Sequence, residues 1–188
     1  MKESAYEVEI KIEITAEERE KLLAKFKERN FVSKGTTQQN DYYIHAEATP
    51  IGAYDIQRYR KDDDEYIYTE KFMEMVEGSL ARRENQHSVT KEEFESKIQE
   101  FPNAVKIQKR REWFDAKNNG VDVSVIIDTV KFDHSPNVRY FIEPEMNTQD
   151  KTKVKEMREG LANFLRDLLE KSELIESPGM FHMAFEKK

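Results

Sequence analysis

The chain has 188 residues and a formal net charge of −7; 37% of its residues are charged and 11% are aromatic. That length suits one domain with a substantial core, and the aromatic content argues against disorder. The negative charge disfavours general binding to nucleic acids or anionic membranes. The absence of cysteine excludes disulfides, thiolate metal sites and a cysteine nucleophile. With an acidic N-terminus and no long apolar run, we expect a cytoplasmic protein.

The first predicted element is a strand with one apolar and one charged face. Residues 6–14 (YEVEIKIEI) alternate without interruption, which is the period-two pattern of a half-buried strand. The charged face reads Glu-x-Glu-x-Lys from Glu7. Thr15 and Glu18 then form the sequence signature of a capping box. They predict a helix from about residue 16 to 29 with one apolar stripe.

Further strands and helices follow in chain order. A second capping box at Thr90 predicts a short helix to about residue 101. A long amphipathic helix should cover about residues 148–171, and Ser177-Pro178 could cap a last short helix. Period two and turn residues predict strands at residues 41–46, 53–60, 65–72, 79–89, 105–114, 121–132 and 138–146. This order indicates an α+β fold, and about eight strands of this length could close into a small antiparallel barrel.

The charged faces of these strands differ in sign. Carboxylates pair up on the first and last strands, whereas cations pair up on the middle ones. The acids are Glu7, Glu9, Glu84, Asp128, Glu143 and Glu145, and the cations are Lys11, Arg58, Arg60, Lys71, Arg82, Lys109 and Arg111. Each face alone could simply be solvated, as on an antiparallel sheet with one wet side. A random wet surface, however, has no reason to segregate its charges in this way.

A barrel that closes with these faces inward cannot have a dry interior, because an unpaired buried ion is very costly. The lumen would then hold water, metal and an anionic ligand. Clustered carboxylates suit Mg²⁺ or Mn²⁺, which take oxygen ligands. Clustered arginines and lysines suit phosphate, which arginine can bind through two parallel hydrogen bonds. Together the two groups are typical of phosphoryl chemistry.

The motifs on these strands resemble those of the CYTH superfamily, the triphosphate tunnel metalloenzymes. The segment EVEIK, which starts at Glu7, resembles the family's ExExK signature. The other matching segments, in chain order, are NDYYI, IQRYR, YTEKF, ARRENQ, KIQKRREWF, VIIDTV and YFIEPEM. Order and spacing agree over about residues 5–146, about three quarters of the chain. Eight matches in order are far more specific than a lone ExExK.

The resemblance implies a single CYTH-like domain over residues 1–188. An eight-stranded antiparallel barrel over about residues 5–146 would enclose a tunnel, with helices over about residues 148–188. The implied ligands of Mg²⁺ or Mn²⁺ are Glu7, Glu9, Glu143 and Glu145. The implied triphosphate-binding residues are Lys11, Arg58, Arg60, Lys71, Arg82, Lys109 and Arg111. The candidate catalytic residues are Glu9, Lys11 and Asp128. Asp128 could orient an arginine, or it could contact a second metal and position the attacking water.

Two departures from the family pattern bear on the site. Gln86 replaces the last acid of an R-x-E-x-E strand, which removes one metal contact. Pro144 interrupts the closing Glu-x-Glu, and since proline cannot donate to a ladder, the direction of Glu145 stays open. Arg82 and Glu84 could also pair with each other within the lumen.

Three functions are compatible with this pattern. The first, which we favour, is divalent-metal-dependent hydrolysis of the terminal phosphate of tripolyphosphate, a nucleoside triphosphate or thiamine triphosphate. The second is a class IV adenylyl cyclase that converts ATP to cyclic AMP and pyrophosphate. The third is a non-catalytic domain that binds polyphosphate or nucleotides. We expect a small-molecule triphosphate as partner, with no DNA and no membrane, and the chain could form a homodimer.

Overall fold

The computed structural model describes residues 6–50, 54–118 and 120–185. Its strands are β1 (Tyr6–Glu9), β2 (Ile12–Ile14), β3 (Val32–Ala48), β4 (Tyr54–Asp62), β5 (Glu65–Val76), β6 (Ser79–Ser88), β7 (Val105–Asn118), β8 (Val121–Phe132) and β9 (Val138–Thr148). Its helices are α1 (Ala16–Glu28), α2 (Lys91–Glu100), α3 (Val154–Leu169) and α4 (Met180–Phe185), with a 3₁₀ turn, η1 (Lys151–Lys153), before α3. Residue 53 of the predicted third strand and residues 186–188 of the predicted last helix lie outside the described residues.

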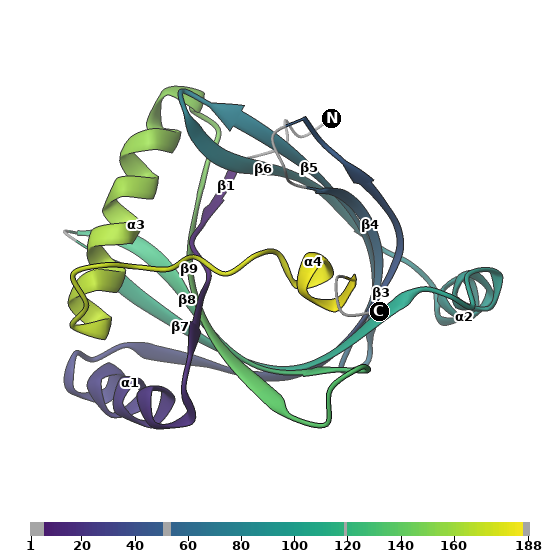
Figure 1. Cartoon of the computed structure of the whole chain (residues 1–188), viewed down its shortest axis with the longest axis horizontal. Helices are drawn as coiled ribbons and strands as arrows, with labels where there is room; N and C mark the ends of the chain where they lie inside the picture. The colour runs from purple at the N-terminus through teal and green to yellow at the C-terminus, as the bar shows by residue number, and fades with distance from the viewer. Residues whose placement is uncertain (1–5, 51–53, 119, 186–188) are drawn as a thin grey trace.

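The sheet closes on itself. Its strand order is β1-β6-β5-β4-β3-β7-β8-β9-β2, and β1 also pairs with β9. All of these pairings are antiparallel. Because β1 and β2 are successive pieces of one strand, the described strands form an eight-stranded barrel, with α1, α2 and α3 outside it (Figure 1). The predicted α+β fold with a closed antiparallel barrel is confirmed.

Several strands run a few residues beyond their predicted ends, and two differ from the prediction in a more important way. The alternation of residues 6–14 predicted one continuous strand, but the strand is interrupted at Ile10 and Lys11. β3 begins at Val32, well before the predicted start. Its first part, residues 32–38, is mostly exposed and polar, so it carries no apolar alternation that would reveal a strand. Backbone pairing with β7 holds this part in place instead.

The first two helices begin at the predicted capping residues. At α1, the Thr15 hydroxyl accepts a hydrogen bond from the Glu18 amide (3.1 Å), and the Glu18 carboxylate accepts one from the Thr15 amide (2.8 Å). At α2, the Thr90 hydroxyl accepts from the Glu93 amide (3.1 Å). None of the helices in the described parts of the chain is long and apolar enough to cross a membrane.

One apolar core lies between the barrel wall and the helices α1 and α3. α3 begins at Val154, later than predicted, because β9 continues to Thr148. Its buried stripe includes Val154, Leu161 and Leu165, and Leu22 and Phe26 of α1 join the same core. The outward faces of the first strand and β8 complete it with Val8, Ile10, Ile12, Ile14, Val123, Val125 and Ile127.

A second apolar core fills one end of the barrel lumen. The short helix α4 lies inside the ring of strands (Figure 1). Its buried residues Met180, Phe181, Met183 and Ala184 pack with the inward-facing residues Ile107, Val130, Phe132 and Phe141. The sequence predicted this helix but not its place in the lumen. The charged residues farther along the same strands therefore line the part of the lumen that α4 leaves open.

Candidate functional site

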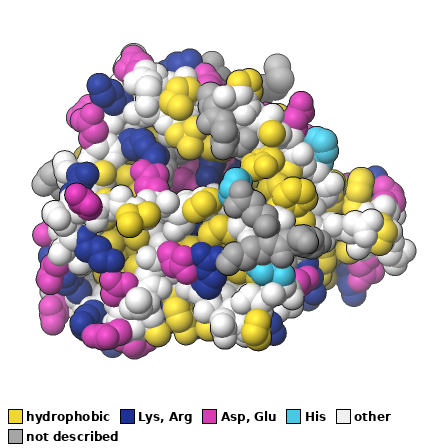
Figure 2. Space-filling view, viewed as in Figure 1, with side chains coloured by type: hydrophobic (Ala, Val, Ile, Leu, Met, Phe, Trp, Pro, Cys, Tyr) yellow, Lys and Arg dark blue, Asp and Glu magenta, His cyan; other side chains and the backbone are white. Residues whose placement is uncertain are grey.

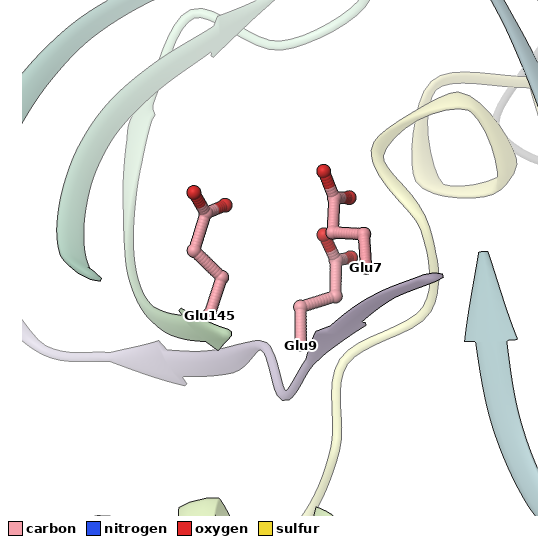
Figure 3. Close-up of side chains that lie close together, drawn as sticks. All are labelled: Glu7, Glu9 and Glu145. Atoms are coloured by element: carbon pink, nitrogen blue, oxygen red, sulfur yellow. The ribbon is translucent and has the colours of Figure 1, made fainter. Parts of the chain in front are cut away.

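The first strand and β9 bring three carboxylates together. Glu9 lies directly opposite Glu145 in the antiparallel register, and Glu7 shares the face of Glu9. One carboxylate oxygen from each of the three residues lies within 4.8 Å of the others. Figure 3 shows the three side chains reaching the same way from β1 and β9. We call this group the acid cluster; grouped carboxylate oxygens are ligands for hard divalent cations, so it could hold a metal ion.

Pro144 does not turn Glu145 away from the lumen. The proline lies where the first strand is interrupted, and its carbonyl accepts a hydrogen bond from the Ile10 amide (3.3 Å). Regular pairing with β9 resumes only at Ile12, opposite Ile142. The hydrogen-bond ladder between the first strand and β9 is thus already interrupted at Pro144, so the missing N–H of the proline removes no further ladder bond. Glu145 keeps its inward direction, which the sequence had left open.

Glu143 lies apart from the acid cluster and among cations. It forms an ion pair with Lys11, and one of its oxygens lies 3.9 Å from Nη2 of Arg111. Burial raises the pKa of Glu143, but the charges of Lys11 and Arg111 outweigh burial and the net shift is downward. The resemblance implied a metal ligand at this position. The structure pairs Glu143 with Lys11, and its implied role as a metal ligand stays a prediction.

The carboxyl groups of the acid cluster differ in their ionisation. Burial, followed by the charges of Glu7 and Glu143, raises the pKa of Glu145 to about 7. Burial also raises the pKa of Glu7, but Lys71 and Arg82 outweigh it, so this pKa is lowered. The surroundings therefore disfavour the charged form of Glu145, whereas they favour the charged form of Glu7.

The seven predicted cations line the same cavity as the acid cluster. This cavity occupies about 730 Å³ of the lumen. Its lining includes Lys11, Arg58, Arg60, Lys71, Arg82, Lys109 and Arg111. Figure 2 shows Lys and Arg side chains beside Asp and Glu side chains in the hollow of the barrel's open face. Such a density of donors suits a polyanion, because guanidinium and ammonium groups form charge-assisted hydrogen bonds with phosphate oxygens.

Asp41 is a buried anchor for three of these cations. Its two oxygens accept from Nε and Nη2 of Arg60, at 2.6 and 3.1 Å. One oxygen also lies 2.9 Å from Nζ of Lys109 and 3.7 Å from Nη1 of Arg58. Burial raises the pKa of Asp41, but Arg60, Lys109 and Arg58 outweigh it and hold the pKa well below its usual range. Burial and then the charge of Arg60 lower the pKa of Lys109 to about 7, although Asp41 opposes this.

Asp128 lies behind Arg111. Nε and Nη2 of Arg111 donate to the two oxygens of Asp128, at 2.8 and 2.6 Å. The Asp128 residue is only 1% exposed. Burial lowers the pKa of Arg111, but the paired carboxylate outweighs burial and raises it well above its usual value. Of the two roles considered for Asp128, these contacts favour the orientation of an arginine.

Two further cations link nearby strands on the lumen face of the barrel. Nζ of Lys71 lies 2.5 Å from a carboxylate oxygen of Glu84 and 3.2 Å from one of Glu7. Arg82 forms an ion pair with Glu9. Arg82 and Glu84 therefore reach different partners, contrary to the alternative that they pair with each other.

The sequence model of the CYTH domain family matches residues 5–177 of the chain. This range contains the acid cluster and all seven predicted cations. The chain belongs to the CYTH family. A search of curated proteins finds no match.

Solved structures show the same CYTH architecture at low sequence identity. PH1819 from Pyrococcus horikoshii OT3 is 22% identical, with a TM-score of 0.71, over 97% of this chain and 99% of that chain. HpAC1 from Hippeastrum, described as an adenylyl cyclase with a dominant triphosphatase activity, is 14% identical, with a TM-score of 0.62, over 98% and 96%. The protein bh2851 from Bacillus halodurans, named an adenylate cyclase, is 12% identical, with a TM-score of 0.65, over 95% and 97%. At these identities the similarity shows the fold alone.

Two residues in or next to the cavity were not predicted from the sequence to have a role there. Asp41 belongs to the NDYYI segment that resembles the family motif, but the sequence analysis gave it no role. Its position on the same strand face as Gln39 and Tyr43 could have indicated that it points into the lumen. Arg158 of α3 lines the cavity. Its signal was a charged residue within the otherwise apolar stripe that faces the barrel.

Proposed function

We propose that the chain is a divalent-metal-dependent triphosphatase, which removes the terminal phosphate of an inorganic or organic triphosphate bound in the barrel. The observation that carries this proposal is the division of one cavity into two kinds of wall. The acid cluster forms one part, and the seven cations form much of the rest. Tripolyphosphate, nucleoside triphosphates and thiamine triphosphate all present the polyanion that such a cavity suits.

The acid cluster would hold the metal. Three carboxylates at this spacing, in a chain without cysteine, fit Mg²⁺ or Mn²⁺ better than a soft metal. Such an ion, when bound, polarises phosphoryl oxygens as a Lewis acid. Glu7, Glu9 and Glu145 are the proposed ligands. Glu143 would instead hold Lys11 in place.

The cations would bind and orient the triphosphate. Arg60 is fixed by Asp41 and Arg111 by Asp128, so these guanidinium groups are in place before a ligand arrives. Lys11 and the other cations add charge around the same volume. Donors that are fixed in advance stabilise the charge that develops on the bridging oxygen without a further cost of reorganisation.

Class IV adenylyl cyclase activity is the second candidate. The cavity also has an apolar wall that includes Tyr54, Ile56 and Phe181, against which the base of ATP could pack. In that reaction the 3′-hydroxyl attacks the α-phosphate and pyrophosphate leaves. HpAC1 and bh2851 both carry the cyclase name, but HpAC1 is described with a dominant triphosphatase activity. We therefore place hydrolysis first.

A substrate panel with product identification tests the proposal. Tripolyphosphate, ATP, GTP and thiamine triphosphate are each incubated with Mg²⁺ or Mn²⁺, and we expect orthophosphate from at least one of them. Glu9→Gln should abolish turnover while the fold is kept. Glu13→Gln is the matched control, because Glu13 follows on the same strand but pairs with Arg139 outside the cavity.

Each contrary outcome has a distinct meaning. Orthophosphate release at the wild-type rate by Glu9→Gln would show that the acid cluster is not the reaction site. Cyclic AMP and pyrophosphate from ATP would establish the cyclase. Tight binding of triphosphates without any product would establish a binding domain.

A further inference from the structure

One edge of the first strand lacks a strand partner over most of its length. In the described part of the chain, β6 pairs with Tyr6 and Glu7 only. Along an antiparallel strand, the backbone hydrogen-bonding groups of successive residues point to opposite sides. Beyond Glu7, alternate residues bond to β9, so the backbone groups of Glu9, Lys11 and Glu13 point to the opposite side, where β6 no longer pairs. Buried backbone groups must find partners elsewhere, because an unpaired one is costly. Two of these three residues belong to the candidate site.

The C-terminal part of the chain supplies the missing partners. Nη1 of Arg158 donates to the carbonyl of Glu9 (2.9 Å). The amide of Ser177 donates to the carbonyl of Lys11 (2.8 Å), and the hydroxyl of Ser177 accepts from the amide of Glu13 (2.9 Å). Residues 174–178, which we call the C-terminal strap, thus take the place of a neighbouring strand beside β2.

Arg158 connects α3 to both the first strand and the strap. It lies one turn from Val154 and from Leu161, on the stripe of α3 that faces the barrel. An arginine there is costly unless its donors are bonded. Nη2 of Arg158 lies 2.5 Å from a carboxylate oxygen of Glu176, and Glu176 forms a backbone bridge with Ile12. One guanidinium group therefore donates both to the first strand and to the C-terminal strap, beside the acid cluster.

We propose that Arg158 is a positioning residue for the acid cluster. By holding the carbonyl of Glu9, it fixes the backbone from which the Glu9 carboxylate reaches the metal, and its link to Glu176 makes the strap part of the same support. This inference rests on the proposed function, in which Glu9 is a metal ligand. Arg158 provides no ligand atom itself and acts through Glu9. Removal of groups that support metal ligands typically weakens binding by about 10- to 100-fold.

Titration with Mn²⁺ alone, without any triphosphate, measures this effect. Arg158→Met should lower Mn²⁺ affinity by about tenfold or more, as followed by the electron paramagnetic resonance signal of free Mn²⁺. Arg158→Lys should recover part of the loss, because an ammonium group can reach the Glu9 carbonyl but cannot at the same time contact Glu176 as the second guanidinium nitrogen does. Arg166→Met is the matched control, since Arg166 is an exposed arginine of the same helix that bonds to Asn163. It should bind Mn²⁺ like the wild type.

Amide hydrogen exchange of the metal-free protein separates this inference from the proposed function. In Arg158→Met the amides of Glu13 and Ser177 should exchange about tenfold faster, because local opening becomes easier. Amides in the β7–β8 ladder should be unchanged. If the wild type binds no Mn²⁺, the proposed function fails and exchange alone decides the inference.

Two results overturn the inference. One is a folded Arg158→Met protein whose Glu13 and Ser177 amides exchange as in the wild type. The other is wild-type Mn²⁺ affinity in that variant, which would leave Arg158 a purely structural residue. If Arg158→Met does not fold, Glu176→Gln, which retains the arginine, provides both measurements with a smaller expected loss. In that case, wild-type Mn²⁺ affinity and wild-type amide exchange in Glu176→Gln would overturn the inference.

Discussion

Glu9 and Glu145 are direct neighbours in the β1–β9 ladder, although one lies near the start of the chain and the other in its last strand. The pairing that closes the barrel therefore also assembles the acid cluster. A slip of this register by one residue would turn one carboxylate to the opposite face. Closure of the barrel and formation of the acid cluster are therefore one structural event.

The different surroundings of Glu145 and Glu143 predict different consequences for metal binding. Glu145→Gln should weaken Mn²⁺ binding by at least about tenfold, because it removes one of three grouped carboxylates. Glu143→Gln should leave Mn²⁺ affinity nearly unchanged and raise the KM for the triphosphate, because Lys11 loses the nearer of its two carboxylate partners. Calorimetric titration with Mn²⁺ and steady-state kinetics measure the two effects. A greater loss of Mn²⁺ affinity in Glu143→Gln would contradict the assignment.

The buried pair of Asp128 and Arg111 predicts a large loss of stability. Asp128→Asn leaves the Arg111 guanidinium buried without its carboxylate, which should cost about 3–5 kcal/mol in the free energy of unfolding. Asp122→Asn is the control on the same strand. Its pair with Lys117 is exposed, so that change should stay within about 0.5 kcal/mol. Urea unfolding measures both, and equal losses would argue against a buried role for Asp128.

The lowered pKa of Lys109 predicts a dependence of stability on pH. This pKa is about 7 in the folded protein and 10.5 for an ordinary lysine. Arg60 and Arg111 contribute to the lowering, whereas Asp41 and Asp128 oppose it. Between these pH values the unfolded chain binds a proton that the folded protein does not. The contribution of Lys109 to the free energy of unfolding should therefore rise with pH above about 7, by at most about 1.4 kcal/mol per pH unit.

Comparison of the wild type with Lys109→Met isolates this contribution. Urea unfolding between about pH 7.5 and 9, below the range in which ordinary tyrosines titrate, should give a shallower rise in the variant. Parallel curves for the two proteins would show that Lys109 keeps its proton in the fold.

The packing of α4 predicts that the last helix stabilises the barrel. Phe181 is buried in the lumen against Tyr43 and Tyr54, so Phe181→Ala should cost about 3–5 kcal/mol in the free energy of unfolding. Phe185 lies in the same helix but is 52% exposed, and Phe185→Ala should cost clearly less. A thermal unfolding series compares them. Equal shifts in Tm would mean that α4 leaves the lumen readily.

The barrel could be predicted because most of its strands alternate between polar and apolar residues. The shared direction of side chains such as Glu9, Lys109 and Arg111 follows from the period-two alternation, and the resemblance to the family predicted that the strands form a closed sheet. The first half of β3 was missed since its exposed polar side chains carry no alternation. The interruption at Ile10 and Lys11 was missed for a different reason: it lies opposite Pro144 of β9 and beyond the pairing with β6, and the alternation of residues 6–14 reveals neither of these.

The site was predicted as a set of residues but not as a network. Periodicity tells which face a side chain occupies, yet it does not tell which partner the side chain selects there. Glu143 and Glu145 share a face and a motif, but Lys11 draws one into an ion pair while the other stays with Glu9. The contacts of Arg158 could not be predicted, because they depend on how α3 docks onto the barrel and on the course of the strap.

The place of α4 has a consequence for the space available to a ligand. Met180 and Phe181 line the same cavity as the cations, and both belong to the core that α4 forms inside the barrel. A change in the packing of this short helix would therefore alter the volume into which a bound polyanion can extend.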